Sequence, residues 1–542
     1  MKKNIMRLRF LMLAVGAVLL IGSCTSRFED INTNPNYPLP GSNDAKYLLA
    51  YALNRSVLPS NAYQNVQTMN ADEFAQFYAN SLQSGTALAA SNYKINDQYI
   101  STFWDNYYLY FASLNTIIRD FSSRPEYTNI VQMARIWKCW MYQRLTDAYG
   151  DVPYFNAANG TGENPAYDDQ KDIYYDMFIV LADAVTKFDN AQTSPGVQDL
   201  VYGGDNAKWI KFANSLRLRM AIRISSVDAA KAKTEAEAAI AGGVINLETE
   251  SAYIKFGGVS STEINPMAHN KGGMRMSTTV YNMLNNIGGQ AWPTGATAPA
   301  APSDGNPAVV DPRGPYMFDL AEDSNGTYQG LWTGTYPGLS LANVSLPQNL
   351  AEANSYVGAK FRVSDKKFAI LKYSETCLLL SEAALNGWAA GGTAQYWYEE
   401  GVTASFAEYE VAATATAYLA STVANDFGTS AAYTHTAGTN NTALDKIHTQ
   451  KWIVLFPENS WEAWAEFRRT NKPTMLVPEY VDPSYFQAPS SNVSTNPKAF
   501  IQRLPYPASE GNTNPISYSA AISKLGGSDY QIQKAVWWDP NK

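Results

Sequence analysis

Cysteine and histidine are scarce in this 542-residue chain, which has three of each. The histidines, His269, His435 and His448, stand far apart without the ligand spacing of a metal-binding motif. CxxC, HExxH, GxSxG and P-loop motifs are also absent. We therefore expect no transition-metal centre, no cofactor and none of the common catalytic machineries.

Positive charge is in short supply as well. The chain has 41 Lys and Arg residues against 49 Asp and Glu residues, which gives a formal net charge of −8. A protein that binds nucleic acid needs a basic surface to match the phosphates. Nucleic acid is therefore excluded as an expected partner.

Long apolar runs are missing except at the N-terminus. Four basic residues precede the uncharged run 10–22, and Cys24 follows it closely. A thirteen-residue helix reaches roughly 20 Å, less than the roughly 30 Å hydrocarbon core of a bilayer, so the run is a poor membrane span. Its layout is typical of a secretory signal peptide, and we assign residues 1–23 to one. Its removal would take four positive charges and bring the net charge from −8 to −12.

The cleavage region, Leu20-Ile21-Gly22-Ser23-Cys24, resembles a bacterial lipobox. In a lipobox the cysteine is lipidated and becomes the first residue of the mature protein, so Cys24 is the predicted lipidation site. We expect residues 24–40 to form a flexible tether and residues 41–542 to form one domain anchored to a membrane through the lipid. An ordinary signal peptide with an incidental cysteine is the alternative.

Helical periodicity dominates the body of the chain, because apolar residues recur at spacings of three and four. The stripes form consecutive pairs: 104–120 with 131–149, 171–191 with 204–225, 368–392 with 393–409, and 443–456 with 459–470. Such pairs predict a mainly α fold with a scaffold of helical hairpins of the tetratricopeptide kind. The tryptophans on these stripes are expected in the core, namely Trp104, Trp137, Trp140, Trp209 and Trp452.

Two stretches interrupt this pattern. Residues 242–365 are rich in Gly and Pro without a sustained helical stripe, and residues 471–542 are similarly irregular. Long irregular insertions on a rigid frame usually carry binding sites. Cys139 and Cys377 lie instead within apolar helical patterns, and we expect two buried free thiols there in preference to one disulfide.

Several segments, in this order along the chain, resemble the SusD/RagB family: FEDINTNPN, RIWKCWMYQRLTDAYGDVPYF, DNAKWIKFANSLRLRMAIRIS, KFAILKYSETCLLLSEAALNGW, FPENSWEAWAEFRRT and RLPYPASEGNTN. The resemblance implies a surface lipoprotein of the Bacteroidetes outer membrane. Such proteins form a lid on a SusC-type TonB-dependent transporter. They capture glycans, or sometimes peptides, without cleaving them. A purely structural lid without affinity for cargo remains a possible reading.

Glycan binding requires exposed aromatic rings flanked by polar groups, because sugar rings are apolar on their faces and hydroxylated at their rims. Aromatic residues in irregular chain are the best candidates, and packing under a loop is the alternative for each. The first choices are Trp292, Trp332, Tyr336 and Tyr316, and the second choices are Tyr93 and Tyr99. Candidate polar partners are Asn92, Asn96 and Arg313.

A glycoside hydrolase is the enzymatic alternative, since Glu375 and Glu382 could act as acid and base. Residues seven apart on a helix lie roughly 10 Å apart, slightly beyond the range of an inverting pair. The two also share an apolar helix face. We expect them to form ion pairs with arginines of another helix, which are Arg217, Arg219 and Arg223.

Two further charged groups have simple interpretations. Glu462 and Glu466, beside Arg468 and Arg469, are predicted to be neighbours on a solvated helix end. The loop 303–314 offers oxygen ligands of the kind that calcium accepts. Its spacing does not match a known calcium loop, and turn chemistry explains the same residues, which are Asp304, Asn306 and Asp311.

Overall fold

The computed structural model describes residues 44–58, 61–81, 90–159, 164–255, 273–291, 309–319, 321, 330–331, 333, 340–341, 344–345, 352, 354–363, 366–478, 500–530 and 532–541. The expected signal peptide, the lipidation site Cys24 and the tether 24–40 lie outside these residues. Of the helices in these ranges, none has both the length and the hydrophobicity that a membrane span requires.

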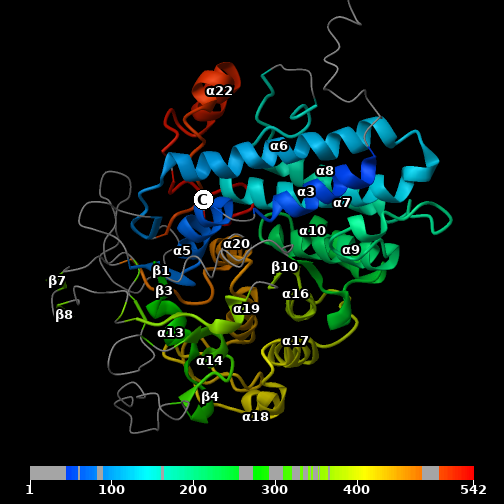
Figure 1. The fold of residues 1–542 in the computed structure, drawn as a ribbon. Helices are drawn as coiled ribbons and strands as arrows, with labels where there is room; N and C mark the ends of the chain where they lie inside the picture. Colours follow the sequence, from blue (N-terminus) through cyan, green and yellow to red (C-terminus); the bar gives the residue numbers. More distant parts are fainter. Residues whose placement is uncertain are drawn as a thin grey trace, which may run out of the picture.

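The first half of the described chain forms a layer of long helices, in the upper part of Figure 1. They are α3 (Ala45–Ser56), α6 (Asp97–Phe121), α7 (Thr128–Tyr149), α8 (Gln170–Ala184), α9 (Asn206–Arg223) and α10 (Ala229–Ala241). Shorter pieces between α3 and α6 are α4 (Asn61–Tyr63), a π-helix η1 (Gln64–Ala71) and α5 (Asp72–Phe74). The layer confirms the predicted helices at 104–120, 131–149 and 204–225, whereas the helix expected over 171–191 ends earlier, because α8 stops at Ala184.

Local sequence signals set the ends of these helices. The Asn96 side chain accepts a hydrogen bond from the backbone N–H of Gln98 and so caps α6, and Asp205 caps α9 through the N–H of Lys208. Helix α7 stops at Gly150, whose φ of 85° suits a residue without a Cβ. The Thr146 hydroxyl donates to the Gly150 carbonyl at 2.6 Å and holds this turn.

The second half adds a group of helices below this layer (Figure 1). They are α16 (Tyr373–Leu385), α17 (Ala394–Glu408), α18 (Ala415–Leu419), α19 (Ala443–Leu455) and α20 (Ser460–Thr470). Near the C-terminus, α21 (Glu510–Thr513) and α22 (Pro515–Lys524) follow. Short 3₁₀ segments are η2 (Ala90–Asn92), η3 (Pro125–Tyr127), η4 (Gly196–Gln198), η5 (Glu248–Glu250), η7 (Ala359–Phe361) and η8 (Ala412–Thr414). The mainly helical architecture is the predicted one.

Small antiparallel sheets of two strands connect distant segments. The pairs are β1 (Tyr78–Asn80) with β3 (Met274–Met276), β2 (Ala252–Lys255) with β10 (Lys367–Leu371), β4 (Asn285–Ala291) with β5 (Val309–Val310), β6 (Phe318–Asp319) with β9 (Tyr356–Val357), and β7 (Ser340–Leu341) with β8 (Val344–Ser345). Two short helices, α13 (Thr278–Leu284) and α14 (Gly314–Met317), lie among them. The insertion 242–365 therefore contains small ordered elements.

Strand β10 corrects one prediction. The helical stripe expected over 368–392 begins as a strand, and α16 starts only at Tyr373. A short apolar run fits a buried strand as well as a buried helix, so periodicity cannot separate them. Pairing with β2, in which Phe368 lies opposite Ile254, decides in favour of the strand.

The predicted core residues are buried. Trp104, Trp137, Trp140, Trp209 and Trp452 are each at most 3% exposed. Cys139 and Cys377 are buried free thiols, as expected. Burial raises the pKa of each thiol to about 12, so both stay protonated and unreactive at neutral pH.

Candidate ligand-binding site

Three of the predicted ligand contacts, Trp292, Trp332 and Tyr336, lie outside the described residues. Described parts of the same insertion pair with the N-terminal segment. Strand β3 pairs with β1, and the backbone N–H of Leu331 donates to the Met276 carbonyl at 2.7 Å. The insertion is thereby tied to the segment before α6, where the second-choice candidates lie.

The prediction that Arg313 is a polar partner for a ligand is wrong. The Arg313 side chain is completely buried, and its guanidinium pairs with the Asp311 carboxylate at 2.7 Å. It also donates to Ser405 at 3.0 Å and to Gln450 at 2.8 Å. Arg313 therefore fastens the insertion to α17 and α19, and it has no surface to offer a ligand. The same pairing uses the Asp311 carboxylate, while Asp304 and Asn306 lie outside the described residues.

The structure also corrects the prediction that Asn92 and Tyr93 contact a ligand. Both are core residues with at most 3% exposure. Burial raises the pKa of Tyr93, so the phenol stays neutral. Asn96 is exposed but is the capping residue of α6, and Tyr99 is half-buried in the first turn of that helix. The flanks of α6 thus supply fewer ligand candidates than the sequence pattern indicated.

Among the predicted ligand contacts that the structure describes, Tyr316 lines a cavity. This cavity, which we call the Tyr316 cavity, has a volume of about 370 Å³. Its walls come from the insertion, strand β10, the end of α17 and the turn between α19 and α20. The lining residues are Glu248, Tyr253, Tyr316, Lys360, Phe361, Lys366, Lys367, Ala369, Lys372, Glu408, Tyr409, Glu410, Phe456 and Glu458.

Lysines and glutamates pair along the edge of the Tyr316 cavity. The Lys360 ammonium lies 4.0 Å from the centre of the Tyr316 ring and 2.6 Å from a carboxylate oxygen of Glu410. Lys366 pairs with Glu458 at 2.8 Å. The Tyr316 ring therefore has a hydrogen-bond donor and an acceptor beside it. This is the combination that sugar rings and their hydroxyls require.

The inner wall is held by Lys372 and Glu408, whose charged atoms lie 2.7 Å apart. Burial by itself would lower the pKa of Lys372, but the Glu408 carboxylate raises it above the ordinary value. Nearby, burial raises the pKa of Glu248, and the charge of Glu408 adds to this effect. The Glu248 carboxylate accepts a hydrogen bond from the Tyr253 hydroxyl at 2.8 Å.

Sequence reasoning did not include these charged residues in the site. Lysines cluster in the stretch 360–372, and this density was a signal that could have been used. Their partners could not be found in the same way, because Glu408 and Glu458 lie far along the chain. The lysines and their glutamate partners meet only because β10 packs against its neighbours.

A second group of charges lies in the interior, and we call it the buried charge network. Arg219 of α9 pairs with Glu375 at 2.8 Å, as expected for interhelical ion pairing. Glu382 pairs instead with Arg469 of α20, also at 2.8 Å. Arg217 pairs with Glu235 of α10. Both carboxylates of the suspected hydrolase pair are thus buried and neutralised by arginine.

Helix α20 overturns the expectation of a solvated helix end. Glu462, Glu466, Arg468 and Arg469 are each at most 7% exposed. Arg223 reaches Glu466 at 2.7 Å, and Trp464 donates from its indole N–H to the Ile501 carbonyl at 3.1 Å. Three of these side chains form ion pairs, whereas Arg468 donates to the backbone carbonyls of Trp464 and Gln502, because neighbouring elements cover the whole helix.

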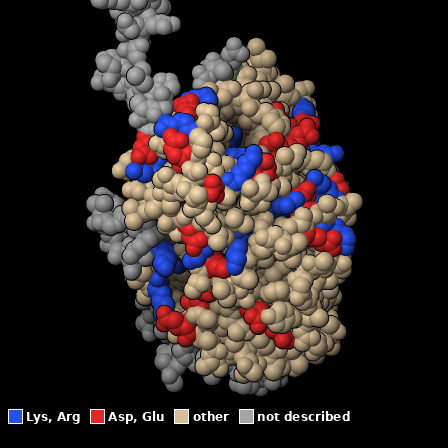
Figure 2. Space-filling model, turned by 90° about the vertical axis from the view of Figure 1, so that its right-hand side faces the viewer, with Lys and Arg blue, Asp and Glu red and all other residues tan. Residues whose placement is uncertain are grey.

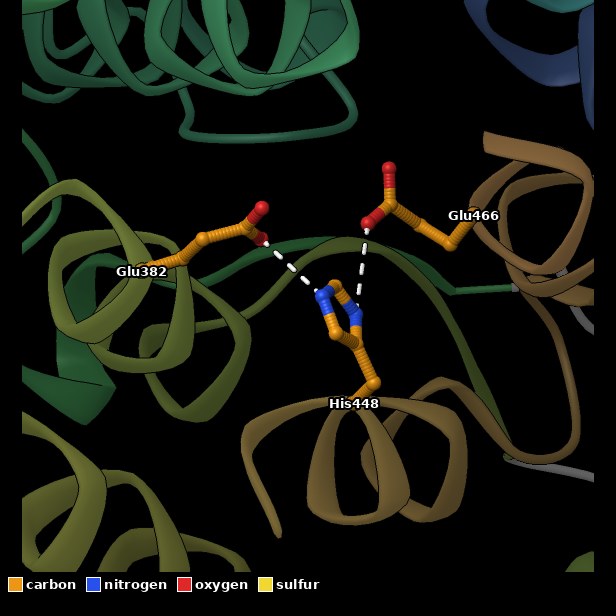
Figure 3. A group of neighbouring side chains, drawn as sticks. All are labelled: Glu382, His448 and Glu466. Atoms are coloured by element: carbon orange, nitrogen blue, oxygen red, sulfur yellow. Dashed lines mark ion pairs between the residues drawn. The ribbon is translucent and has the colours of Figure 1, made fainter. Parts of the chain in front are cut away.

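His448 of α19 lies between two carboxylates of this network (Figure 3). Its ring nitrogens are 3.6 Å from Glu382 and 3.8 Å from Glu466. Burial lowers the pKa of His448 to about 4, against the opposing effect of Glu382. The imidazole is therefore neutral at pH 7.

These three residues have the composition of a metal site, but their surroundings do not fit one. The ligand atoms lie within 4.8 Å of one another. Arg469 is already 2.8 Å from Glu382 and 2.7 Å from Glu466, and Lys451 is 2.9 Å from Glu466. These fixed cations neutralise both carboxylates and would repel a metal ion. The network is a structural element.

The charged groups on the surface are mixed in sign. On the face shown in Figure 2, Lys and Arg side chains alternate with Asp and Glu side chains over broad uncharged areas. No continuous basic stripe crosses this described face.

Comparisons with known proteins cover nearly the whole described chain. Residues 43–289 match a family described as starch-binding and associating with the outer membrane. Residues 308–539 match a family described as SusD and RagB outer membrane lipoproteins. Among the curated proteins, none matches this chain.

Solved structures of similar proteins share the fold. A SusD homologue from Parabacteroides distasonis is 31% identical with a TM-score of 0.82, and the match covers 92% of this chain and 99% of that one. A chitin-binding SusD homologue from Flavobacterium johnsoniae is 26% identical with a TM-score of 0.74, covering 92% and 99%. A further chitin-binding protein is 26% identical with a TM-score of 0.67, covering 91% and 100%.

Proposed function

The chain belongs to the SusD/RagB family of outer-membrane lipoproteins, and on this premise we propose that it captures oligosaccharides at the cell surface and delivers them to a SusC-type TonB-dependent transporter. The lipid on Cys24 anchors it to the outer leaflet, and the transporter is its membrane partner. Trp292, Trp332 and Tyr336 join Tyr316 in contacting the glycan. Residues 41–542 act as one domain.

The observation that carries this proposal is the agreement between family and site chemistry. A 26% identical relative described as chitin-binding shares the fold along 92% of this chain. The Tyr316 cavity adds an aromatic ring with an ammonium group 4.0 Å from its centre and a carboxylate beside it. Such a pocket can stack on a sugar ring while it bonds to the hydroxyls.

Binding without cleavage is part of the proposal. Glu375 and Glu382, which a hydrolase would have needed, are held by arginines in the buried charge network. We expect no release of reducing ends when the protein is incubated with a glycan that it binds. Steady release above a heat-inactivated control would contradict the proposal and indicate a hydrolase.

The first test is affinity electrophoresis of the mature chain in gels that contain different polysaccharides. We expect retardation by one glycan class, loss of retardation in a Trp292→Ala, Trp332→Ala double variant, and roughly tenfold weaker binding in Tyr316→Ala, since aromatic contacts contribute about 1 kcal/mol or more. Tyr47→Ala is the control, because Tyr47 is a 60% exposed aromatic residue on α3 that does not line the Tyr316 cavity.

The outcomes separate the alternatives. Unchanged retardation in both aromatic variants would refute the assigned site. Absence of retardation by every glycan would refute glycan capture and favour a peptide cargo, which the same panel design can test with labelled peptides. Recovery of the transporter with the wild-type protein from detergent-solubilised membranes would test the partner separately.

A further inference from the structure

A second cavity lies against α6, away from the Tyr316 cavity, and we call it the α6 cavity. Its volume is about 330 Å³, at the lower end of the range of small-molecule sites. Residues from α6, from the segments around 153–158 and 164–165, and from α21 surround it. The C-terminal segment is held to α6 by the Ala508 backbone N–H, which donates to Asp97 at 2.8 Å.

Aromatic side chains form one wall of the α6 cavity. Trp104 and Tyr108 are one turn apart on α6, with ring centres 5.0 Å apart. The Tyr108 hydroxyl donates to the Pro153 carbonyl at 2.8 Å, which fixes the ring against the opposite segment. Tyr167 stacks on Trp104 from outside the lining, with ring centres 5.8 Å apart. The aromatic wall is therefore rigid.

Carboxylates form the other wall. Asp105 and Glu510 both line the α6 cavity, and the described residues of its lining include no Lys, Arg or His. Within the described part of the chain, neither carboxylate forms an ion pair at 4.0 Å or less. Glu510 accepts a hydrogen bond from the Tyr167 hydroxyl at 2.6 Å. Burial raises the pKa of Asp105, and the negative charges of Glu510 and Asp97 add to the effect.

A buried amide adds a further acceptor. Asn514 lines the α6 cavity and is only 4% exposed. Its Nδ2 donates to the Pro165 carbonyl at 2.9 Å, whereas its Oδ1 has no hydrogen-bond partner in the described structure. A buried acceptor without a donor is unfavourable, so a ligand that supplies N–H groups would stabilise this site.

We propose that the α6 cavity binds a protonated primary amine, carried by a compact ligand such as an amino sugar. The carboxylates supply the counter-charge, Asn514 accepts a hydrogen bond, and the aromatic rings attract the cation through their faces. A calcium ion fits less well, because it needs six to eight oxygen ligands and one of the two walls of the α6 cavity is aromatic. The proposal is independent of glycan capture at the Tyr316 cavity.

Calorimetric titration of the metal-free mature protein at pH 7 tests the assignment. Glucosamine is the probe, and N-acetylglucosamine is the matched control, because acetylation removes the positive charge and keeps the ring. We expect glucosamine to bind at least tenfold more tightly. Asp105→Asn and Glu510→Gln should each weaken glucosamine binding about tenfold, since each removes one charge-assisted interaction.

Asp172→Asn is the control variant, since Asp172 is an exposed carboxylate on α8, which contributes no residue to the α6 cavity. It should bind glucosamine like the wild type. Methylamine in place of glucosamine identifies the source of the amine: weaker binding supports an amino sugar, and equal binding supports any small ammonium ion.

Other results would overturn the proposal. These are equal affinity for the two sugars, unchanged affinity in both cavity variants, or binding of calcium without binding of glucosamine. A melting temperature within the wild-type range will show that the Asp105→Asn and Glu510→Gln variants are folded. Loss of glycan retardation with glucosamine binding intact would refute only the proposed function.

Discussion

The buried charge network and the edge of the Tyr316 cavity contain the same kinds of charged groups in two different environments. In the network, the side chains of Arg219, Arg223 and Arg469 are at most 3% exposed and each meets carboxylates from other helices. At the cavity edge, the side chains of Lys360 and Glu410 are 42% and 74% exposed. Exposure decides whether an ion pair holds the fold or stays available to a ligand.

Arginine supplies most cations of the network, with Lys451 as an exception, whereas lysine supplies those of the cavity edge. Arginine has a planar group that can bond to two carboxylates at once, and Arg469 does so with Glu382 and Glu466. Lysine is a single charge on a flexible stem, which suits an edge where a ligand must displace water and adjust the contacts. The network is therefore built from fixed contacts, and the cavity edge from adjustable ones.

The largest effect is expected from removing one charge in the network. Glu466 contacts Arg223 at 2.7 Å, Arg469 at 2.7 Å and Lys451 at 2.9 Å. Glu466→Gln keeps the shape but leaves these buried cations short of counter-charge. We expect the free energy of unfolding to fall by about 3–5 kcal/mol, measured by urea denaturation at pH 7. A loss below about 1 kcal/mol would show that the network is dispensable.

The second-largest effect is that of His448 on the free energy of unfolding, and it should depend on pH. The pKa of His448 is about 4 in the fold and 6.5 as the ordinary value, so only the unfolded chain takes up this proton between those values. Protonation then favours unfolding, and stability falls as the pH drops from 6.5 to 4, by up to about 3 kcal/mol for this residue. Above pH 6.5 His448 is neutral in the folded and the unfolded chain, so this residue no longer makes stability depend on pH.

The measurement compares wild type with His448→Gln across this range. The four charged neighbours of the ring are retained in the variant, and they are Glu382, Glu466, Lys451 and Arg469. The difference between the two unfolding free energies should change by about 3 kcal/mol between pH 7 and pH 4. A difference that is the same at every pH would mean that His448 does not remain neutral in the fold.

The smallest effect on stability is expected at the cavity edge. Glu410→Gln breaks the pair with Lys360, whose partners are both substantially exposed. Exposed ion pairs contribute about 0–1 kcal/mol, so the free energy of unfolding should change by less than about 1 kcal/mol. Glycan retardation should weaken in the same variant if the pair belongs to the ligand site. A fall of several kcal/mol in the free energy of unfolding would show that this pair stabilises the fold as the buried charge network does.

Much of the fold could be predicted because its main signal is local. Helical stripes are readable within a few residues, and the structure confirms most of them as helices. Prediction failed at Lys367–Leu371, where pairing with a strand more than a hundred residues away overrides the local pattern. It failed again at α20, since a one-sided periodicity cannot show that a helix is covered on all sides.

The candidate site was less predictable. The rule that selects residues in irregular chain chose both Tyr316, which lines a cavity, and Arg313, which is completely buried. Both residues lie in α14 or beside it, so composition could not separate them. The difference arises because one side chain points to the cavity and the other to Asp311 and Gln450.

The sequence by itself determined the helical class and the family, because periodicity and motif order are properties of the chain alone. Only the tertiary structure decided which charges meet. Arg219 and Glu375 are 156 residues apart, and Arg223 and Glu462 are 239 apart. No spacing rule reaches that far, since such pairs form only when packed helices exclude water and bring opposite charges from distant segments into contact.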